Sequence, residues 1–390
     1  MTSLGAWELP EELRMVRETV RRFMENDVKP AEDQVPHDAY ELPESLFRPL
    51  SDKARTLGLW GYRFPKQYGG GGLNLLGQAV LAEEAAKCRM GINIPACGAF
   101  GLDVPSPIFR GSQQQIERYA IPAIQAGKRV YIAISEPSGG SDPARAIRLK
   151  AVRRGNSYVL NGQKMWIGAA ASAEWGLVFA RTDPGAGRGG ISCFIVDKNV
   201  KGLTMRPIPV IRSLSPYEMF FDNVEVPEEN RLGEEGQGFA LCDKFVVESR
   251  IPFSAGCIGV AKAALRIATE WAKTRETFNS KLADKQAIQW MLADSEMELR
   301  AARLLVWQAA WKCDLGQDAK IDSSIAKVAA TETASRVVDR AIQIMGGLGV
   351  SKELPLERWY RELRVRRISE GPSEVHRMVV ARHILRSGND

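Results

Sequence analysis

The spacing of apolar residues changes twice along the chain and predicts three regions of different secondary structure. From about residue 10 to 127 the apolar positions follow helical spacing, with a break at Pro36, because proline lacks a backbone donor and restricts the residue before it. From residue 129 to about 226 apolar and polar residues alternate in short runs, which is typical of strands. From about residue 238 onward apolar residues recur every three or four positions, which indicates helices again.

The central region predicts short strands joined by turns. Gly, Asn, Asp and Pro between the apolar runs mark the turns. The expected strands cover residues 130–134, 158–160, 176–180 and 193–196, and the expected turns lie at residues 155–156, 161–162 and 183–185. Since no helical stretch separates these strands, we expect an antiparallel sheet or barrel rather than alternating strands and helices.

The last region predicts a helical bundle. Three long apolar patterns and a shorter one after Glu370 are joined by short connections, as in an antiparallel four-helix bundle. The predicted fold class is therefore α+β. It comprises an N-terminal helical domain (residues 1–128), a central antiparallel β-sheet or barrel domain (residues 129–237) and a C-terminal four-helix-bundle domain (residues 238–390).

Composition and charge narrow the class of protein. A chain of 390 residues with 45% hydrophobic and 26% charged residues is typical of a soluble protein with more than one domain. The acidic, amphipathic segment at residues 9–16 is unlike a signal or transit peptide, so we expect an intracellular protein, in the bacterial cytoplasm or a eukaryotic mitochondrial matrix. The net charge of +6 comes from dispersed side chains, with acids interleaved even in the densest cluster at residues 358–367. We expect no binding to nucleic acid or membrane, whereas an anionic substrate or an acidic protein partner would suit such a surface.

Cysteine and histidine form no metal-binding pattern in the sequence. The cysteines lie far apart, and no C-x-x-C pair occurs. They are Cys88, Cys97, Cys193, Cys242, Cys257 and Cys313, and the histidines are His37, His376 and His383. We therefore expect neither a metal site nor a disulfide framework, and redox chemistry would need an organic cofactor.

Glu370 is the candidate catalytic residue. It precedes Gly371 and Pro372 at the start of an apolar helical pattern. A carboxylate beside a flexible residue at a helix entrance can act as a base in a site closed to water. The alternative is a surface glutamate that the helix dipole favours at this position. This motif alone leaves both interpretations open.

Five segments carry a family resemblance, at residues 132–142, 161–168, 271–288, 343–349 and 369–371. They occur in the order found in the acyl-CoA dehydrogenases, and the chain resembles this FAD-dependent family over essentially its whole length. The first, residues 132–142, is similar to the family's strand and loop that end in T-E-P-x-x-G-S-D. The resemblance implies that Ile132, Ile134 and Ser135 contact the flavin ring, and that Ser141 lies beside the flavin and the bound thioester. A glycine-rich turn of this kind lets a flat ring approach closely.

The second segment, residues 161–168, is similar to the family's N-G-x-K-x-W-I sequence. The resemblance implies that Trp166 covers the outer face of the flavin. A tryptophan buried in the core is the alternative, because large aromatic residues dominate cores. The chain departs from the family at Gly168, where a hydroxyl usually faces the flavin and only a backbone N–H remains here.

The third and fourth segments resemble the family's R-x-x-F, Q-x-[IV] and Q-x-x-G-G-x-G sequences. Arg275 offers a forked donor that suits a pyrophosphate, and paired glycines let the backbone approach a dinucleotide. A solvated arginine and an ordinary helix end are the alternatives. The resemblance implies that the FAD of a neighbouring subunit contacts Arg275, Phe278 and Gln286, and that the dinucleotide contacts Gln343, Gly346 and Gly347.

The fifth segment contains Glu370, which matches the catalytic base of the family. Gly371 follows it as in the family, and Arg382 matches the arginine twelve residues further on. Arg250 matches an arginine that orients the base and the substrate. Gly371 and Arg382 are likewise expected at the substrate.

Two departures and one alternative base accompany this match. Pro372 and Glu374 replace a threonine and a glutamine that often touch FAD in the family. Some relatives place the base next to the arginine matched by Arg250, where this chain has Ser249. Glu248 lies one residue further back, roughly 100° around a helix, so we do not favour it.

The resemblance implies FAD-dependent dehydrogenation of an acyl-CoA to the 2-enoyl-CoA. Glu370 would take the α-proton, and flavin N5 would take the β-hydride. The backbone N–H of Glu370 would bond to the thioester oxygen and stabilise its developing charge. Electrons would pass to an electron-transfer flavoprotein, and the subunits would form a dimer or tetramer. An acyl-CoA oxidase and a non-catalytic flavoprotein of the same fold are the alternatives, and the length and branching of the acyl chain stay open.

Overall fold

The computed structural model describes residues 8–386, which divide into two compact units. The helical unit contains residues 8–58, 73–100 and 247–386, and the sheet unit contains residues 59–72 and 101–246. The helical unit combines segments from both ends of the chain. The three-domain division at residues 128 and 237 stays a prediction, because these compact units divide the chain on a different basis.

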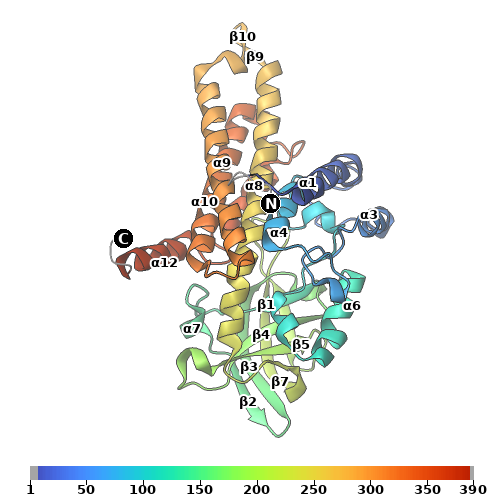
Figure 1. The fold of residues 1–390 in the computed structure, drawn as a ribbon, viewed down its shortest axis with the longest axis vertical. Coiled ribbons are helices and arrows are strands. Elements are labelled where there is room, and N and C mark those ends of the chain that lie inside the picture. Colours follow the sequence, from blue (N-terminus) through green and yellow to red (C-terminus); the bar gives the residue numbers. More distant parts are fainter. Residues whose placement is uncertain (1–7, 387–390) are drawn as a thin grey trace. The chain divides into compact units, whose positions relative to one another are not determined.

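Long helices form the C-terminal part of the helical unit (Figure 1). Short connections join α9 to α10, and Arg336 and Arg340 of α10 both pair with Glu298 of α9, so these two helices lie side by side and antiparallel. This part confirms the predicted helical bundle, with α11 as an additional short helix. Its helices and hairpin are α8 (Gly238–Thr274, from residue 247 onward in this unit), β9 (Glu276–Thr277), β10 (Ser280–Lys281), α9 (Gln286–Asp314), α10 (Lys320–Met345), α11 (Leu356–Arg366) and α12 (Ser373–Arg386).

The buried faces of α8 and α10 are largely alanine. Ala261 and Ala268 of α8, with Ala330 and Ala334 of α10, belong to one buried cluster. Alanine has the highest helix propensity, and its small side chain lets helices approach closely. By length and composition α8 could cross a membrane, but 72% of that stretch is buried within the protein, as in the core helix of a bundle.

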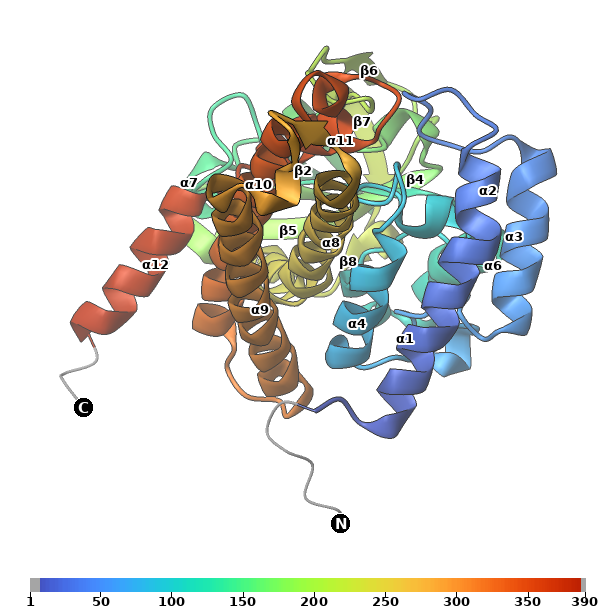
Figure 2. The ribbon, with the colours of Figure 1, turned by 90° about the horizontal axis from the view of Figure 1, so that it is seen from above.

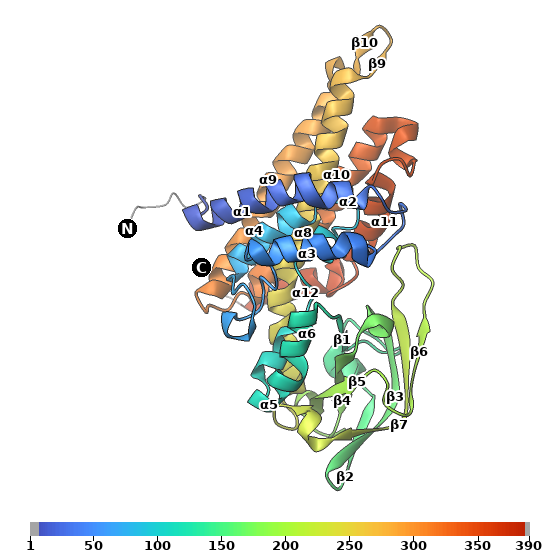
Figure 3. The same cartoon turned by 90° about the vertical axis from the view of Figure 1, so that its right-hand side faces the viewer.

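The N-terminal helices also belong to the helical unit. Figures 2 and 3 show α1 (Glu11–Phe23) continuing into α2 (Lys29–Glu32) through a π-helical turn, with α3 (Glu44–Thr56) beside them. The helix ends just before the predicted break at Pro36. α4 (Leu75–Ala85) begins at Asn74, whose side chain accepts a 2.9 Å hydrogen bond from the N–H of Gly77.

Eight strands form one mixed sheet in the described part of the sheet unit (Figure 3). Their order is β6-β7-β3-β2-β4-β5-β8, and β1 pairs with β4 in parallel. Most pairs are antiparallel, as predicted, and the expected strands appear as β1, β3, β4 and β5. The strands are β1 (Val130–Ala133), β2 (Lys150–Arg154), β3 (Ser157–Ile167), β4 (Trp175–Arg181), β5 (Ile191–Asp197), β6 (Leu203–Pro207), β7 (Tyr217–Pro227) and β8 (Arg231–Leu232).

Helices cover one face of this sheet. Ile116 and Ile124, from the segment that contains α5 (Gln113–Gln115) and α6 (Ile121–Ala126), form one buried cluster with Leu177 of β4. A separate buried cluster includes Val178 of the same strand. Because side chains alternate between the faces of a strand, both faces of β4 are buried. The short helix α7 (Pro143–Ala146) follows the loop after β1.

One predicted turn is wrong. Asn161 and Gly162 lie inside β3, where the pairing with β7 shifts register between Leu160 and Gly162. Gly162 has φ +140°, and a Cβ there would lie 3.2 Å from the Cα of Leu149. The glycine therefore permits a bulge within a continuous strand rather than a turn between two strands.

Candidate active site

The turn between α11 and α12 fixes the position of Glu370. Glu370 has φ +55°, an uncommon left-handed conformation for a residue with a side chain, and Gly371 follows with φ +94°. A Cβ on Gly371 would lie 2.8 Å from Nε2 of His376, so this position needs glycine for space as well as for its φ. The backbone N–H of Ser373 bonds to the carbonyl of Arg367 at 3.1 Å and closes the turn. We call residues 367–372 the base turn.

Two residues at one point of α8 contact Glu370. The hydroxyl of Ser249 donates a 2.7 Å hydrogen bond to Oε2 of Glu370. Arg250, predicted to help orient the carboxylate and the substrate, donates from Nε to the backbone carbonyl of Glu370 at 3.0 Å. Glu370 itself is half-buried. The structure thus brings together Glu370, Arg250 and Ser249, and the serine contacts the carboxylate.

Two buried basic side chains support the same turn. Nζ of Lys327 on α10 donates to the carbonyl of Gly371 at 2.8 Å, and Nε2 of His376 on α12 lies 3.1 Å from the carbonyl of Glu370. Both side chains are almost completely buried. Burial lowers the pKa of Lys327 to about 8 and the pKa of His376 to about 4, with the charges of Arg250 and Lys327 adding to the effect on His376. The histidine is therefore neutral at pH 7.

The sequence offered little signal for these supporting residues. Ser249 stood out only as the position of an alternative base. Lys327 lies within a helical pattern that its apolar members define, and a lysine there is ordinarily solvated. His376 follows Glu370 by six residues, but its orientation depends on the left-handed turn. Only the packing of three helices around the base turn identifies them.

The first two segments predicted to bind the flavin are tied together in the sheet unit. Lys164, on β3 and completely buried, forms a 2.8 Å ion pair with Glu136, and it also donates to the carbonyl of Ile134 at 2.9 Å. The carboxylate of Glu136 accepts two further bonds, from the N–H groups of Arg148 and Leu149. Burial lowers the pKa of Lys164 to about 8, although Glu136 acts against this shift. Neither residue of this ion pair was predicted as a site residue.

The same region has features that fit a flat aromatic ring. The N–H of Met165 bonds to the carbonyl of Ser135 at 2.9 Å, which holds the predicted flavin contact against β3. Trp166 has φ +65° and is 54% exposed, so it is not a core residue of the sheet unit. A Cβ at Gly168 would meet nothing within 4 Å. An exposed indole with open space beside it leaves room for the ring of a flavin.

The loop after β1 brings Ser141 to the surface of the sheet unit. Ile132 and Ile134 are half-buried, and Ser141 is exposed. A Cβ at Gly140 would lie 2.8 Å from Oγ of Ser135, so the glycine lets the loop close over that serine. The predicted contacts of the first segment therefore come from one strand end and its loop.

The remaining predicted FAD contacts lie at the other end of the bundle from the base turn. The antiparallel packing of α9 and α10 places the end of α10 near the start of α9, and Arg275 directly precedes the hairpin between α8 and α9. Gln343 lies about 24 Å along α10 from Lys327 at the usual rise per residue. One chain thus does not bring this group to its own Glu370. The group consists of Arg275, Phe278, Gln286, Gln343, Gly346 and Gly347.

This distant group is open to solvent in the single chain. Phe278 has φ +50° and is 95% exposed, and Arg275, Gln286 and Gln343 are exposed as well. Gly346 has φ +63°, and a Cβ added to it or to the next glycine would meet nothing within 4 Å. An exposed guanidinium, two exposed amides and an open backbone suit an anionic dinucleotide. On α12, Arg382 is also exposed.

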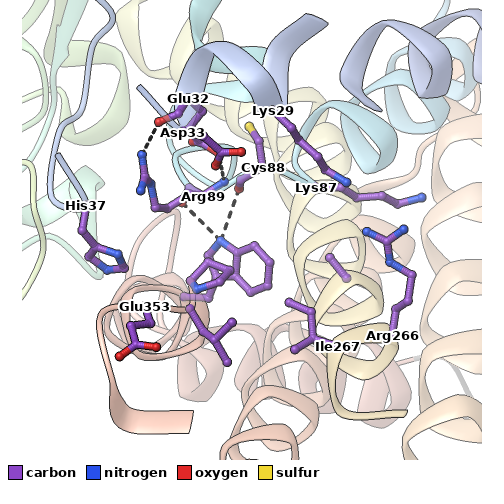
Figure 4. Close-up of a pocket in the computed structure, with 14 residues that line it drawn as sticks. Lys29, Glu32, Asp33, His37, Lys87, Cys88, Arg89, Arg266, Ile267 and Glu353 are labelled. Carbon is purple, nitrogen blue, oxygen red and sulfur yellow. Dashed lines mark hydrogen bonds between the residues drawn. The ribbon is translucent and has the colours of Figure 1, made fainter. Parts of the chain in front are cut away.

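A pocket of about 260 Å³ in the helical unit lies elsewhere (Figure 4). None of the predicted site residues lines it.

The sequence predicted no metal site, yet Glu32, Cys88 and Cys97 bring potential ligand atoms within 4.8 Å of one another. Both oxygens of Glu32 accept backbone bonds, at 2.7 Å from Arg89 and 2.6 Å from Met90. The carboxylate therefore has a structural role in joining α2 to the segment after α4.

Comparison with known families identifies the class of protein. Residues 10–128, 132–224 and 236–385 match the N-terminal, middle and C-terminal domains of acyl-CoA dehydrogenases. The chain belongs to the acyl-CoA dehydrogenase family, whose members are oxidoreductases acting on CH–CH bonds. Its fold is that of the family.

Individual relatives align over nearly the whole chain. The short-chain specific acyl-CoA dehydrogenase of Rattus norvegicus is 36% identical, over 97% of this chain and 92% of the relative. The 3-(aryl)acrylate reductase of Clostridium sporogenes is 35% identical over 96% and 99%, and the caffeyl-CoA reductase-Etf complex subunit CarC of Acetobacterium woodii is 34% identical over 96% and 99%.

Solved structures of similar proteins superpose on nearly the whole chain. Butyryl-CoA dehydrogenase from Megasphaera elsdenii superposes with a TM-score of 0.86 and 31% identity, over 98% of this chain and 100% of that one. The FAD complex of PigA superposes with a TM-score of 0.86 and 26% identity, again over 98% and 100%. The second comparison is with a protein of this fold that contains bound FAD.

Proposed function

We propose that the chain oxidises an acyl-CoA thioester to the 2-enoyl-CoA with bound FAD, and that Glu370 is the base. The observation that carries this proposal is the left-handed conformation of Glu370 with its carboxylate bonded to Ser249. A strained conformation of a residue with a side chain persists when surrounding contacts enforce it, and such residues cluster at functional sites. Family membership supports the reaction class.

The proposed chemistry removes one proton and one hydride from adjacent carbons. Glu370 takes the proton from the α-carbon, and the electron pair of that C–H bond forms the new double bond. When bound, FAD supplies the acceptor for the hydride that leaves the β-carbon. The bond from Ser249 holds Oε2, so Oε1 is the oxygen that remains to receive the proton. A fixed carboxylate reduces the reorganisation needed when the proton moves.

The residues that would hold FAD fall into two groups. In the sheet unit, Ile132, Ile134, Ser135, Ser141, Trp166 and the N–H of Gly168 would contact the ring system. The exposed group around Arg275 would bind the dinucleotide of a neighbouring subunit, because Gln343 of this group lies about 24 Å along α10 from Lys327, which contacts the base turn of the same chain. This separation supports a homo-oligomer, a dimer or tetramer. Gly371, Arg250 and Arg382 would contact the substrate.

We also propose an electron-transfer flavoprotein as the acceptor of the electrons. The similarity to CarC, which is named as a subunit of a complex with Etf, supports this partner. An intracellular location, in the bacterial cytoplasm or the mitochondrial matrix, fits such a partner. Two similar proteins are named as reductases, so enoyl-CoAs belong in the substrate panel as well.

Anaerobic mixing of the purified flavoprotein with a panel of acyl-CoAs tests the proposed reaction. We expect the flavin absorbance to bleach with a preferred acyl-CoA, and the Glu370→Gln variant to retain FAD and bind the same acyl-CoA without bleaching. Bleaching of the variant at the wild-type rate would assign the base to another residue. The reaction class would be rejected if no acyl-CoA bleaches the wild-type flavin and no enoyl-CoA reoxidises the reduced flavin.

An acyl-CoA oxidase is the second candidate, and Gly168 is the observation that favours it. The hydroxyl that usually faces the flavin is missing there, and the position has open space. Peroxide formed in air, at a rate equal to substrate turnover, would identify an oxidase. Turnover that requires an electron-transfer flavoprotein would identify a dehydrogenase.

A further inference from the structure

A buried lysine supports the base turn from behind. Lys327 lies on α10 with its side chain completely buried, and its Nζ donates to the carbonyl of Gly371 at 2.8 Å. Burying an amino group is costly unless it is hydrogen-bonded, and most lysines avoid burial altogether. The cost of placing Lys327 here therefore indicates a role for that contact. The proposed transfer of proton and hydride does not itself use it.

Three helices donate to two consecutive carbonyls of the base turn. Lys327 of α10 bonds to the carbonyl of Gly371, while Arg250 of α8 and His376 of α12 bond to the carbonyl of Glu370. These donors come from positions far apart in the sequence; Lys327 and Gly371 are separated by 44 residues. Both acceptor residues have positive φ. This backbone conformation thus orients the two carbonyls toward the three donors.

Holding this conformation matters because it sets the direction of the catalytic side chain. A residue with a side chain stays in a sparsely populated backbone conformation only when the surrounding contacts enforce it. Without its donors, the pair Glu370–Gly371 would relax toward ordinary φ values and the carboxylate would turn away from its bond with Ser249. A displacement of about 1 Å at a reacting group can lower the rate by about 10²-fold.

We propose that Lys327 is a positioning residue for this reaction: its buried amino group binds the Gly371 carbonyl and, together with Arg250 and His376, keeps Glu370 in the left-handed conformation that aims the carboxylate. This inference rests on the proposed role of Glu370 as the base. Lys327 touches neither substrate nor flavin in this proposal, and it acts through the base turn alone.

The test replaces Lys327 with methionine in the full-length holoprotein. Lys327→Met keeps the length of the side chain and removes both the donor and the charge. Thr331→Val is the matched control, since Thr331 is buried one turn further along α10 and its hydroxyl bonds within that helix, to the carbonyl of Lys327. For each protein we would measure bound FAD, the dissociation constant of the preferred acyl-CoA and the rate constant of anaerobic flavin bleaching.

We expect Lys327→Met to bind FAD and the acyl-CoA within about threefold of the wild type while its bleaching rate constant falls by about 10²-fold. Thr331→Val should bleach at the wild-type rate. A bleaching rate within about threefold of the wild type in Lys327→Met would overturn the proposal. So would a loss of rate that matches the loss of bound FAD. If none of the acyl-CoAs bleaches the wild-type flavin, the proposed function fails before Lys327 is tested.

Lys327→Gln keeps the proposal testable if the methionine variant does not fold. Glutamine retains a buried N–H donor on a shorter stem and carries no charge. Positioning through the Gly371 carbonyl predicts a bleaching rate between those of the wild type and a variant without a donor, with substrate binding unchanged. A glutamine variant whose loss of bleaching rate only matches its loss of bound FAD would overturn the proposal, because the effect would then act on cofactor binding and not on the base turn.

Discussion

The hydroxyl of Ser249 donates a 2.7 Å hydrogen bond to Oε2 of Glu370, across 121 residues of sequence. This bond connects α8 directly to the carboxylate of the proposed base. The neighbouring residue on α8, Arg250, binds the backbone carbonyl of the same glutamate. One point on α8 therefore fixes both the main chain and the side chain of Glu370. The arrangement leaves Oε1 as the oxygen available to the substrate.

Replacing Ser249 with alanine should slow flavin reduction without weakening substrate binding. A hydrogen bond to a charged group contributes about 1.5–3 kcal/mol, which corresponds to roughly a tenfold to a hundredfold loss if the bond acts mainly in the transition state. Stopped-flow bleaching with the preferred acyl-CoA measures the rate constant and the substrate dissociation constant together. An unchanged rate constant would show that the carboxylate does not need this bond.

Ser254→Ala provides the control for that experiment. Ser254 lies on the same helix, is completely buried, and its hydroxyl has no hydrogen-bond partner among the described residues. Its removal should leave the bleaching rate and the bound FAD unchanged. If both alanine variants lose rate equally, the effect belongs to the packing of α8 rather than to the bond with Glu370.

The pKa of Lys327 predicts opposite effects of alkaline pH on rate and on stability. Burial lowers this pKa from 10.5 to about 8, so the side chain is an ammonium below about pH 8 and a neutral amine above it. The neutral amine is a weaker donor to the Gly371 carbonyl, so the bleaching rate should fall as the pH rises through about 8. The charged or titratable groups around it are Cys257 and Arg250 of α8, Glu332 of α10, Glu370 of the base turn and His376 of α12.

Lys327 should affect stability in the opposite direction to the bleaching rate as the pH rises. Between about pH 8 and 10.5 the unfolded chain binds more protons at this lysine than the folded chain does, so the free energy of unfolding rises with pH over that range. A rate that falls while stability rises separates positioning from unfolding. Denaturant titrations and bleaching rates at each pH measure both, and Lys327→Met should lose both dependences. An alkaline limb that persists near pH 8 in this variant would assign it to another group.

The buried ion pair of the sheet unit should be needed for FAD binding. Lys164→Met removes the partner of Glu136 and the donor to the Ile134 carbonyl. Removing one member of a buried pair typically costs about 3–5 kcal/mol, and here it would also release the strand end that carries the predicted flavin contacts. Thermal unfolding and the flavin absorbance of the purified protein measure the two effects.

Lys150→Met is the matched control for Lys164→Met. Lys150 lies on the adjacent strand β2 and is exposed, so its replacement should change the free energy of unfolding by no more than about 0.5 kcal/mol. Its FAD content should equal that of the wild type. A Lys164→Met protein with full FAD content and unchanged stability would contradict the role that its contacts imply.

The sequence predicted the order of helices, strands and bundle because hydrophobic spacing is a local signal. A motif that resembles those of a known family also indicated Glu370 as the base, and this role stays a prediction. The sequence could not predict the left-handed φ of Glu370, since a glutamate there has no intrinsic preference for that conformation. The donors that enforce it, Lys327 and His376, reach the base turn only after the helices pack.

Local signals also failed where a strand is irregular or exposed. Asn161 and Gly162 carry a strong turn signal, yet the pairing of β3 with β7 continues across them through a bulge. The strand β6 (Leu203–Pro207) has no fully buried residue, so it offers little of the alternation that marks a strand. Lys164 was overlooked for a related reason, because lysine on a strand is usually exposed and its partner Glu136 lies on a different segment.

The separation of Arg275 from Glu370 predicts a result that only a shared site can give. If Arg275 serves the FAD of a neighbouring subunit, each active site takes Glu370 from one chain and Arg275 from the other. Arg275→Ala and Glu370→Gln homo-oligomers should then both be inactive, the first for lack of FAD and the second for lack of a base. Mixed oligomers should behave differently, because one of their sites receives both intact residues.

Co-expression of the two variants with different affinity tags would isolate those mixed oligomers. With random pairing about half of the dimers are mixed and each has one intact site of two, so the unsorted mixture should recover about a quarter of the wild-type activity in the presence of added FAD. Tandem purification should raise this to about half. If Arg275 served its own chain, every site would lack one of the two residues, and the purified mixed oligomer would be as inactive as either parent. Recovery thus depends on a second subunit supplying the Arg275 that completes the site, because Arg275 and Glu370 of one chain lie at different ends of the bundle.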